Sequence, residues 1–205
     1  MEDSKLELPR AIDTMGGIEK YACCFQITEI EMVKLLTNKT VLDLGSGLGG
    51  LAKEATIKHV PTKIFSVNPK IITEATRSKE RKYTLELVED CGKTENVQKK
   101  HDDLLTSALG ENLPYKNESF DIVFDVMAVT HYSNENDFRK AINEMFRVTK
   151  KGGQIYIYAD FGAEFDNEKK YIDKRAILKQ EGISFRELRE NGYGLPKGFK
   201  ITKPA

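Results

Sequence analysis

A carboxylate and a set of glycines lie together early in the chain, where an apolar segment ends. Asp43 stands two residues before Gly45, and Gly47, Gly49 and Gly50 follow at short intervals. Glycine tolerates positive φ and lets the main chain approach a ligand closely, so these glycines predict a nucleotide-like ligand held against the backbone. The negative charge of Asp43 would repel a phosphate and attract a cation. The segment therefore predicts a ligand site next to an acid.

Two interpretations of this glycine-rich turn compete. Gly45-x-Gly47-x-x-Gly50 has the spacing of the dinucleotide fingerprint, in which a pyrophosphate lies on a helix N-terminus, as in an NAD-linked oxidoreductase. Asp43-x-Gly45-x-Gly47-x-Gly49 resembles the acidic, glycine-rich first motif of class I S-adenosylmethionine-dependent methyltransferases. S-adenosylmethionine carries an ammonium, a carboxylate and a sulfonium, but no phosphate. A glycine triad alone does not decide between the two.

A second segment favours the methyltransferase interpretation. Residues 110–124 contain Leu113-Pro114 followed by an aromatic residue, a polar turn, then Ser119-Phe120-Asp121 and an apolar run. This block resembles the segment that methyltransferases of this class show between their third and fourth strands. The resemblance extends over about residues 38–160 and concerns the cofactor, not the methyl acceptor. It implies a Rossmann-like fold with S-adenosyl-L-methionine as the cofactor.

The resemblance also assigns cofactor-binding residues by position. The acid and the turn after it would line the methionine part, and Asp125 would lie near its amino group. Asn68 would reach the ribose, and Leu109 with Gly110 would border the adenine. The full set is Asp43, Gly45, Ser46, Gly47, Gly49, Asn68, Leu109, Gly110 and Asp125.

Two of these positions depart from the family pattern. The strand that ends at Asn68 usually ends in an acid that binds both ribose hydroxyls. Asparagine accepts one such hydrogen bond without the charge, which predicts affinity weaker by roughly 1 kcal/mol, about fivefold to tenfold. The adenine position is commonly Asp, and the ungapped register places Leu109 there. A register that used Asp102 instead would need an insertion before Leu113. These departures leave open a catalytically silent domain that serves only in binding.

His131 is the candidate catalytic residue, because it follows the fourth expected strand near the ligand crevice and could act as a general base. The alternative is a half-exposed loop histidine. A metal site has little support: Cys23 and Cys24 are adjacent, and the chain has no Cys-x-x-Cys or His-x-x-x-His pattern. We therefore expect no bound metal.

Alternating strands and helices must position these residues. Helical spacing predicts one helix over residues 18–37 and a strong amphipathic helix over 134–149, which Lys150-Lys151-Gly152-Gly153 would end. Strands are expected at 41–44, 63–67, 104–109, 120–126 and 154–159. Further helices are expected from the glycine turn to His59, over 69–89 and over 167–181. A closing hairpin is expected at 184–189 and 199–202.

This order predicts an α/β fold, doubly wound, with a mostly parallel seven-stranded sheet, helices on both faces and an antiparallel C-terminal hairpin. We expect one domain over 1–205, with an N-terminal helical segment over 1–37 that could act as a lid around Tyr21 to Phe25, and a Rossmann-like core over 38–205. A helix before the first strand counts against a dehydrogenase.

Composition bounds the partners. Lys plus Arg and Asp plus Glu both number 32, so the overall charge favours neither nucleic acid nor an anionic membrane. The chain has no apolar run long enough to span a bilayer and no signal-peptide pattern at its start, which predicts a cytoplasmic protein. We expect a small-molecule acceptor, because large insertions that build a macromolecule-binding domain are lacking. The sequence indicates no oligomeric state.

Overall fold

The computed structural model describes residues 16–47, 49–68, 104–129, 134–158, 174–189 and 196–205. Several sequence-based expectations fall outside these ranges. They are the helix over 69–89, the first part of the helix over 167–181, the alternative adenine residue Asp102 and the candidate base His131.

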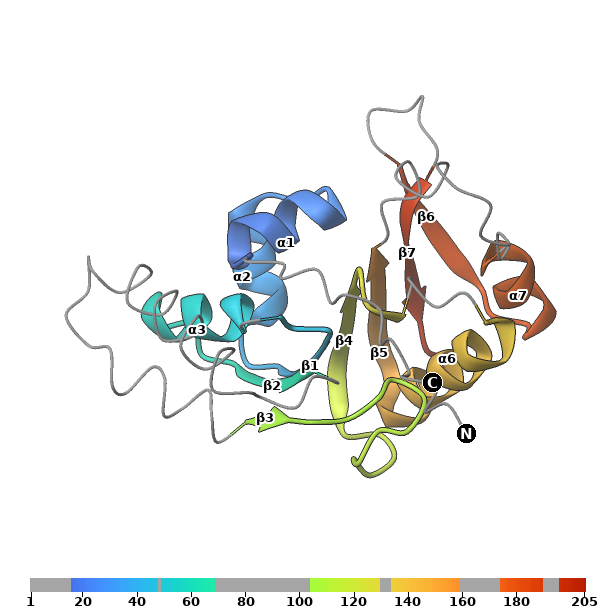
Figure 1. Cartoon of the computed structure of the whole chain (residues 1–205). Coiled ribbons are helices and arrows are strands. Elements are labelled where there is room, and N and C mark those ends of the chain that lie inside the picture. The colour runs from blue at the N-terminus through green and yellow to red at the C-terminus, as the bar shows by residue number, and fades with distance from the viewer. Residues whose placement is uncertain (1–15, 48, 69–103, 130–133, 159–173, 190–195) are drawn as a thin grey trace, which may run out of the picture.

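A seven-stranded sheet in the order β3-β2-β1-β4-β5-β7-β6 forms the centre of the fold (Figure 1). Strands β1 to β5 pair in parallel, whereas β7 runs antiparallel to both β5 and β6. The predicted doubly wound sheet with an antiparallel C-terminal hairpin is confirmed. The strands are β1 (Thr40–Leu44), β2 (Lys63–Val67), β3 (Leu105–Thr106), β4 (Phe120–Val126), β5 (Thr149–Tyr158), β6 (Phe185–Arg189) and β7 (Pro196–Thr202).

Helices cover both faces of the sheet (Figure 1). Helices α1 (Ile18–Phe25), α2 (Glu29–Leu36) and α3 (Gly50–Ile57) pack on one face, and α6 (Glu135–Val148) and α7 (Lys174–Gln180) pack on the other. Alternate residues of β4 divide between the two layers: Ile122 and Phe124 face the first, and Val123 faces the second. A strand buried on both faces must be apolar nearly throughout, and the sequence of β4 has this pattern.

Aromatic packing fixes α1 on the sheet. The ring of Phe25 stacks on that of Phe124 in β4, with 5.2 Å between centroids, and lies 5.1 Å from the ring of Tyr156 in β5. The ring of Tyr21 meets Phe124 edge-on at 5.6 Å. Tyr21 and Phe25 are both buried, so these α1 side chains belong to the hydrophobic core of the domain.

The single helix expected over residues 18–37 is wrong, because the chain forms two helices there. Gln26 adopts a left-handed conformation with φ 57° that ends α1, and Thr28 starts α2 with a capping box closed by Glu31. Ile30, in α2, is 68% exposed. A local capping signal therefore overrode the apolar spacing.

The expected glycine stop after α6 is also wrong. Helix α6 ends at Val148, Thr149 is already extended, and β5 runs on through Lys150, Gly152 and Gly153. The C-terminal end of α6 is instead capped by Lys203, a residue far away in the sequence. The Lys203 ammonium donates hydrogen bonds to the carbonyls of Phe146 and Thr149 at 2.8 and 2.7 Å.

Two further features concern the edges of the sheet and its topology. The third strand covers only Leu105–Thr106 of the expected 104–109. β1 lies between β2 and β4, so the chain leaves β1 towards β2 on one side and returns to β4 on the other. The carboxyl ends of β1 and β4 therefore form the topological switch point, where ligands bind in open α/β sheets.

No helix in the described ranges is long and apolar enough to cross a membrane.

Candidate functional site

The glycine-rich turn after β1 is tied to the end of β2 by three hydrogen bonds. The backbone N–H groups of Gly45 and Ser46 donate to the carbonyl of Val67 at 2.9 and 3.2 Å. The side-chain amide of Asn68 donates to the carbonyl of Gly47 at 3.1 Å. The structure thus brings the turn residues and Asn68 together at the ends of the neighbouring strands β1 and β2.

Positive φ angles explain the glycines of this turn. Gly45, Gly47 and Gly49 have φ angles of 68°, 55° and 73°, a region that residues with a Cβ atom rarely adopt. At Gly45 a Cβ atom would also lie 2.2 Å from the Cβ of Ala128, in the segment after β4. The β1 turn therefore packs directly against the β4 turn, and only glycine fits at this contact.

Asp43 is the central side chain of the site. It is fully buried, and its Oδ1 accepts a hydrogen bond of 2.7 Å from the phenol of Tyr21. Within the described residues its Oδ2 has no hydrogen-bond partner. Burial raises the pKa of Asp43 to about 7, opposed by the Tyr21 hydrogen bond and reinforced by the charge of Asp125. Asp43 is therefore a buried acid with an oxygen available to a ligand.

Tyr21 was missed as a site residue by sequence reasoning. Burial and the neighbouring Asp43 raise the pKa of the Tyr21 phenol well above its usual value, so the phenol stays protonated and can only donate to a carboxylate. In the sequence Tyr21 is one more large residue on the inner face of a helix. Its contact with a strand residue 22 positions later depends on tertiary packing, which local patterns do not show.

Asp125 has a different role from Asp43. Its Oδ1 accepts the backbone N–H groups of Ala128 and Val129 at 3.2 and 2.9 Å, so it shapes the turn that follows β4. Asp125 is fully buried beside Leu44 in the strand register, and its charge acts on Asp43. The structure supports a turn-shaping role, and a direct contact with a ligand ammonium stays a prediction.

Two buried hydroxyl groups accompany Asp43. Ser66 of β2 is paired with Asp43 in the parallel register, so both side chains lie on the same face of the sheet. Ser46 lies in the turn itself. The hydroxyl oxygens of both serines have no hydrogen-bond partner in the described part of the chain. Buried polar atoms without partners are costly in free energy. We therefore expect a ligand or an ordered water to supply hydrogen bonds to the niche formed by Asp43, Ser46 and Ser66.

The remaining predicted site residues lie along the same edge or outside the described ranges. The N–H of Asn68 donates to the carbonyl of Thr106, which ties the end of β2 to β3. Leu109 and Gly110 follow β3 at this edge. Leu109 is 45% exposed, whereas Gly110 is buried. His131 is not among the described residues, so its role as a base stays a prediction.

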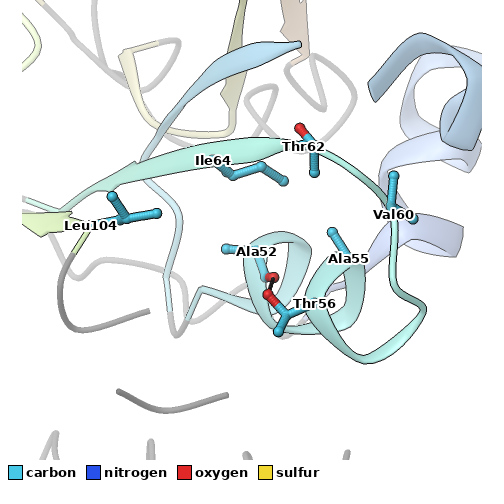
Figure 2. A pocket seen from close by; sticks show the side chains of 7 residues that line it. All are labelled: Ala52, Ala55, Thr56, Val60, Thr62, Ile64 and Leu104. Carbon is cyan, nitrogen blue, oxygen red and sulfur yellow. Dashed lines mark hydrogen bonds between the residues drawn. The ribbon is translucent and has the colours of Figure 1, made fainter. Parts of the chain in front are cut away.

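A small pocket lies elsewhere, between α3 and β2 (Figure 2). Its lining consists of Ala52, Ala55, Thr56, Val60, Thr62, Ile64 and Leu104. None of the predicted site residues lines it, and its lining carries no charged group. It therefore offers nothing that would recognise a charged amino-acid group, in contrast to the niche at Asp43.

The niche at the end of β1 fits a ligand with an ammonium group. Asp43 presents a buried oxygen without a hydrogen bond, and the hydroxyls of Ser46 and Ser66 offer further polar contacts. Helix α3 begins beside it, with Gly49 as an N-cap that makes no side-chain capping bond, so its first N–H groups favour an anion such as a carboxylate. The site thus pairs an acceptor for a cation with donors for a carboxylate, the two charges of a free amino acid.

Comparison with known proteins assigns a family to this geometry. A sequence profile described as a methyltransferase domain matches residues 42–157, more than half of the chain. The norajmaline N-methyltransferase of Rauvolfia serpentina is 29% identical over 144 residues, which is 69% of this chain and 44% of that protein. The human protein named Probable tRNA methyltransferase 9B is 31% identical over 67 residues, 33% of this chain and 14% of that protein. The match thus spans less than half the length of these curated relatives.

Solved structures show the same fold. A protein from Pyrococcus horikoshii superimposes with a TM-score of 0.58 at 17% identity, covering 96% of this chain and 97% of that one. A SAM dependent methyltransferase from Aquifex aeolicus gives a TM-score of 0.51 at 18% identity, covering 84% of this chain and 85% of that one. At such identities the likeness concerns the fold alone.

Proposed function

Because this chain belongs to the methyltransferase domain family, we propose that it transfers a methyl group from S-adenosyl-L-methionine to a small-molecule acceptor. One observation carries this proposal. A fully buried aspartate ends β1 directly before a positive-φ glycine turn, and its Oδ2 has no partner among the described residues. A buried carboxylate suits the ammonium of an amino acid and would repel the diphosphate of NAD.

Each residue of the site would contact a different part of the cofactor. Asp43 would bind the ammonium of the methionine part, and the turn with the first N–H groups of α3 would bind its carboxylate. Asn68 would accept a hydrogen bond from the ribose, and Leu109 and Gly110 would border the adenine. Asp125 would act by shaping the β4 turn, and its contact with the amino group stays part of the proposal.

When bound, S-adenosylmethionine supplies a methyl group that its sulfonium has already activated. The contribution of this chain is then mainly to orient the donor and the acceptor, and such alignment is worth ~7–11 kcal/mol. The rigid contact of the β1 and β4 turns at Gly45 and Ala128 provides a fixed support for that alignment. His131 is the candidate base for an acceptor that must lose a proton.

A small-molecule acceptor is favoured over an RNA acceptor by two observations. The relative named for norajmaline matches 69% of this chain, whereas the human relative named for tRNA matches 33%. The chain also carries equal numbers of basic and acidic residues, 32 of each, while RNA binding relies on a surplus of positive charge.

Formation of S-adenosylhomocysteine during incubation with candidate acceptors tests the acceptor class. We expect turnover with a member of a panel of small amines, phenols and thiols, and background formation only with bulk tRNA. A matched variant, Asp43→Asn, serves as the control, because it removes the proposed ammonium contact. Turnover on tRNA with none on the small-molecule panel would contradict the proposed acceptor class.

Asn68→Asp tests the ribose contact separately from the fold. The variant loses the amide donor to the Gly47 carbonyl, so the unliganded protein should lose about 0.5–1.5 kcal/mol of stability. An aspartate carboxylate can bind both ribose hydroxyls, so the affinity for S-adenosylhomocysteine should rise about fivefold to tenfold. Thermal unfolding and calorimetric titration measure the two effects. Lower stability with unchanged affinity would place Asn68 away from the ribose.

A further inference from the structure

We propose that Tyr21 is a positioning residue of the cofactor site, which holds one oxygen of Asp43 by a hydrogen bond and thereby favours the ionised form of the carboxyl group, the form that binds the ammonium. Cofactor affinity then depends on pH through this pair. The inference rests on the proposed function and adds a residue from the N-terminal helix to the site.

The packing around Tyr21 fixes the position of its phenol. Tyr21 is buried, and its ring meets Phe25 and Phe124 edge-on at centroid distances of 6.2 and 5.6 Å. Helix α1 is also held at its start, because Glu54 of α3 accepts the N–H of Ile18 at 2.6 Å. Ring packing and this cap leave the Tyr21 hydroxyl directed at Asp43 Oδ1, at 2.7 Å.

This hydrogen bond matters because Asp43 has little other support for its charge in the part of the chain that the structure describes. A hydrogen bond from Tyr21 to Oδ1 favours the carboxylate form, whereas burial and the charge of Asp125 disfavour it. Since Tyr21 takes Oδ1, the second oxygen is the one left for an ammonium, and it has no hydrogen bond within the described residues.

The titratable groups around Asp43 come from several elements. Helix α1 contributes Tyr21 and the buried Cys24, and β4 contributes Asp125. The neighbour on β2 is Ser66, which does not titrate, and α3 carries the buried Lys53 in its interior. Among the described residues, Tyr21 lowers the pKa of the Asp43 carboxyl and Asp125 raises it.

The direction of the pH effect follows from this balance. The pKa of Asp43 is raised to about 7, so below neutrality the carboxyl is protonated and must lose its proton before it binds an ammonium. Affinity should therefore fall by up to about tenfold per pH unit below that pKa and level off above it. Without the Tyr21 hydroxyl the pKa of Asp43 rises further, and the whole profile moves to higher pH.

The test is the affinity of wild type and Tyr21→Phe for S-adenosylhomocysteine, measured by calorimetry from pH 6 to pH 9. The ratio of the two dissociation constants cancels the titration of the ligand itself. We expect the ratio to be small at pH 9 and to rise to about tenfold at pH 6, as for a shift of roughly one pH unit. Carbon-detected NMR of the Asp43 carboxyl in the unliganded proteins should show the same upward shift of its midpoint.

Tyr156→Phe is the matched control. Tyr156 packs in the same aromatic cluster, with its ring 5.4 Å from that of Phe124, but its hydroxyl donates to Gln154 at 2.8 Å. Its removal should leave the pH profile of wild type unchanged. In an Asp43→Asn background, Tyr21→Phe should likewise have no pH-dependent effect.

The outcomes separate this inference from the proposed function. Wild-type protein that fails to bind S-adenosylhomocysteine at every pH would contradict the proposed function. Wild-type binding with Tyr21→Phe weakened by the same factor at pH 6 and pH 9 would overturn the positioning role alone. A rising ratio with an unshifted Tyr156→Phe profile would establish it.

Discussion

Asp43 shows how one residue can serve binding at a cost to the unliganded fold. Its carboxyl is fully buried, with a pKa near 7 instead of the ordinary 3.8. The folded state therefore favours the protonated form relative to the unfolded chain. The stability that this preference contributes is fully present below about pH 4 and is lost as the pH rises towards 7. A bound ammonium would offset that loss.

This balance predicts the pH dependence of the stability of the unliganded protein. Between pH 5 and pH 7 the free energy of unfolding should fall by about 1.4 kcal/mol per pH unit through Asp43. Asp43→Asn should remove this fall, since asparagine does not titrate. Urea unfolding of both proteins at several pH values measures it. Parallel profiles for wild type and variant would show that Asp43 ionises as readily as in water.

Glycine is required at position 45 for two reasons, the left-handed backbone and the close contact with Ala128, and mutations can separate them. Gly45→Ala adds left-handed backbone strain of about 1–2 kcal/mol and a steric conflict with Ala128 of about 1–3 kcal/mol. Gly182→Ala, at φ 68° with no atom within 4 Å of an added Cβ, should show the backbone strain alone. Ala128→Gly in the Gly45→Ala background should recover the difference. Equal losses at Gly45 and Gly182 in chemical denaturation would contradict the tight contact of the two turns.

Local signals in the sequence sufficed for part of the candidate site. Asp43 and its glycines form a contiguous pattern whose residue types state their own conformational needs. The Tyr21 phenol and the Ser66 hydroxyl come from other elements, and only the folded sheet brings them beside Asp43. A contact of that kind leaves no periodicity or motif for sequence reasoning to detect.

At the scale of elements, α1 is part of the hydrophobic core. Phe25→Ala should lower the free energy of unfolding by about 3–5 kcal/mol, because it empties a space enclosed by Phe124 and Tyr156. Ile30→Ala on the exposed side of α2 is the control and should change stability by less than about 0.5 kcal/mol. Similar small effects at both positions would mean that α1 does not support the sheet. Thermal or urea unfolding distinguishes these results.

The N-terminal lid stays a prediction at this scale. Its test is the rate of limited proteolysis near the N-terminus with and without S-adenosylmethionine. We expect slower cleavage with the cofactor, since the Tyr21–Asp43 hydrogen bond links α1 to the proposed ammonium site. Equal rates would count against a lid.

Element prediction succeeded where burial imposes a strong pattern. β4 and α6 were placed within a residue or two because one is buried on both faces and the other has a continuous apolar stripe. It failed where a local feature competed with that pattern. A left-handed Gln26 and the Thr28 capping box divide one apolar repeat into two helices. At the end of α6 the chain passes directly into β5, and Gly152, with a left-handed φ of 70°, lies in the irregular part of the β4–β5 pairing instead of ending the helix.

The whole molecule derives its site from topology. Reversal of strand order between β1 and β4 places the Asp43 turn and the Asp125 turn side by side, where Gly45 meets Ala128. This arrangement followed from the alternation of strands and helices and from the resemblance over about residues 38–160, and the family match covers residues 42–157. The identity of the methyl acceptor could not be predicted from the sequence, because a cofactor motif carries no information on the second substrate.

The β1 turn is proposed to bind the amino-acid end of S-adenosylmethionine through Asp43. Calorimetric titration of the wild-type protein and of Asp43→Asn with S-adenosylhomocysteine at pH 8, with NAD as the competing ligand, tests this contact. We expect binding of S-adenosylhomocysteine to wild type, affinity about tenfold to a hundredfold weaker in Asp43→Asn, and no heat with NAD. Equal affinity in both proteins, or binding of NAD in place of S-adenosylhomocysteine, would contradict it.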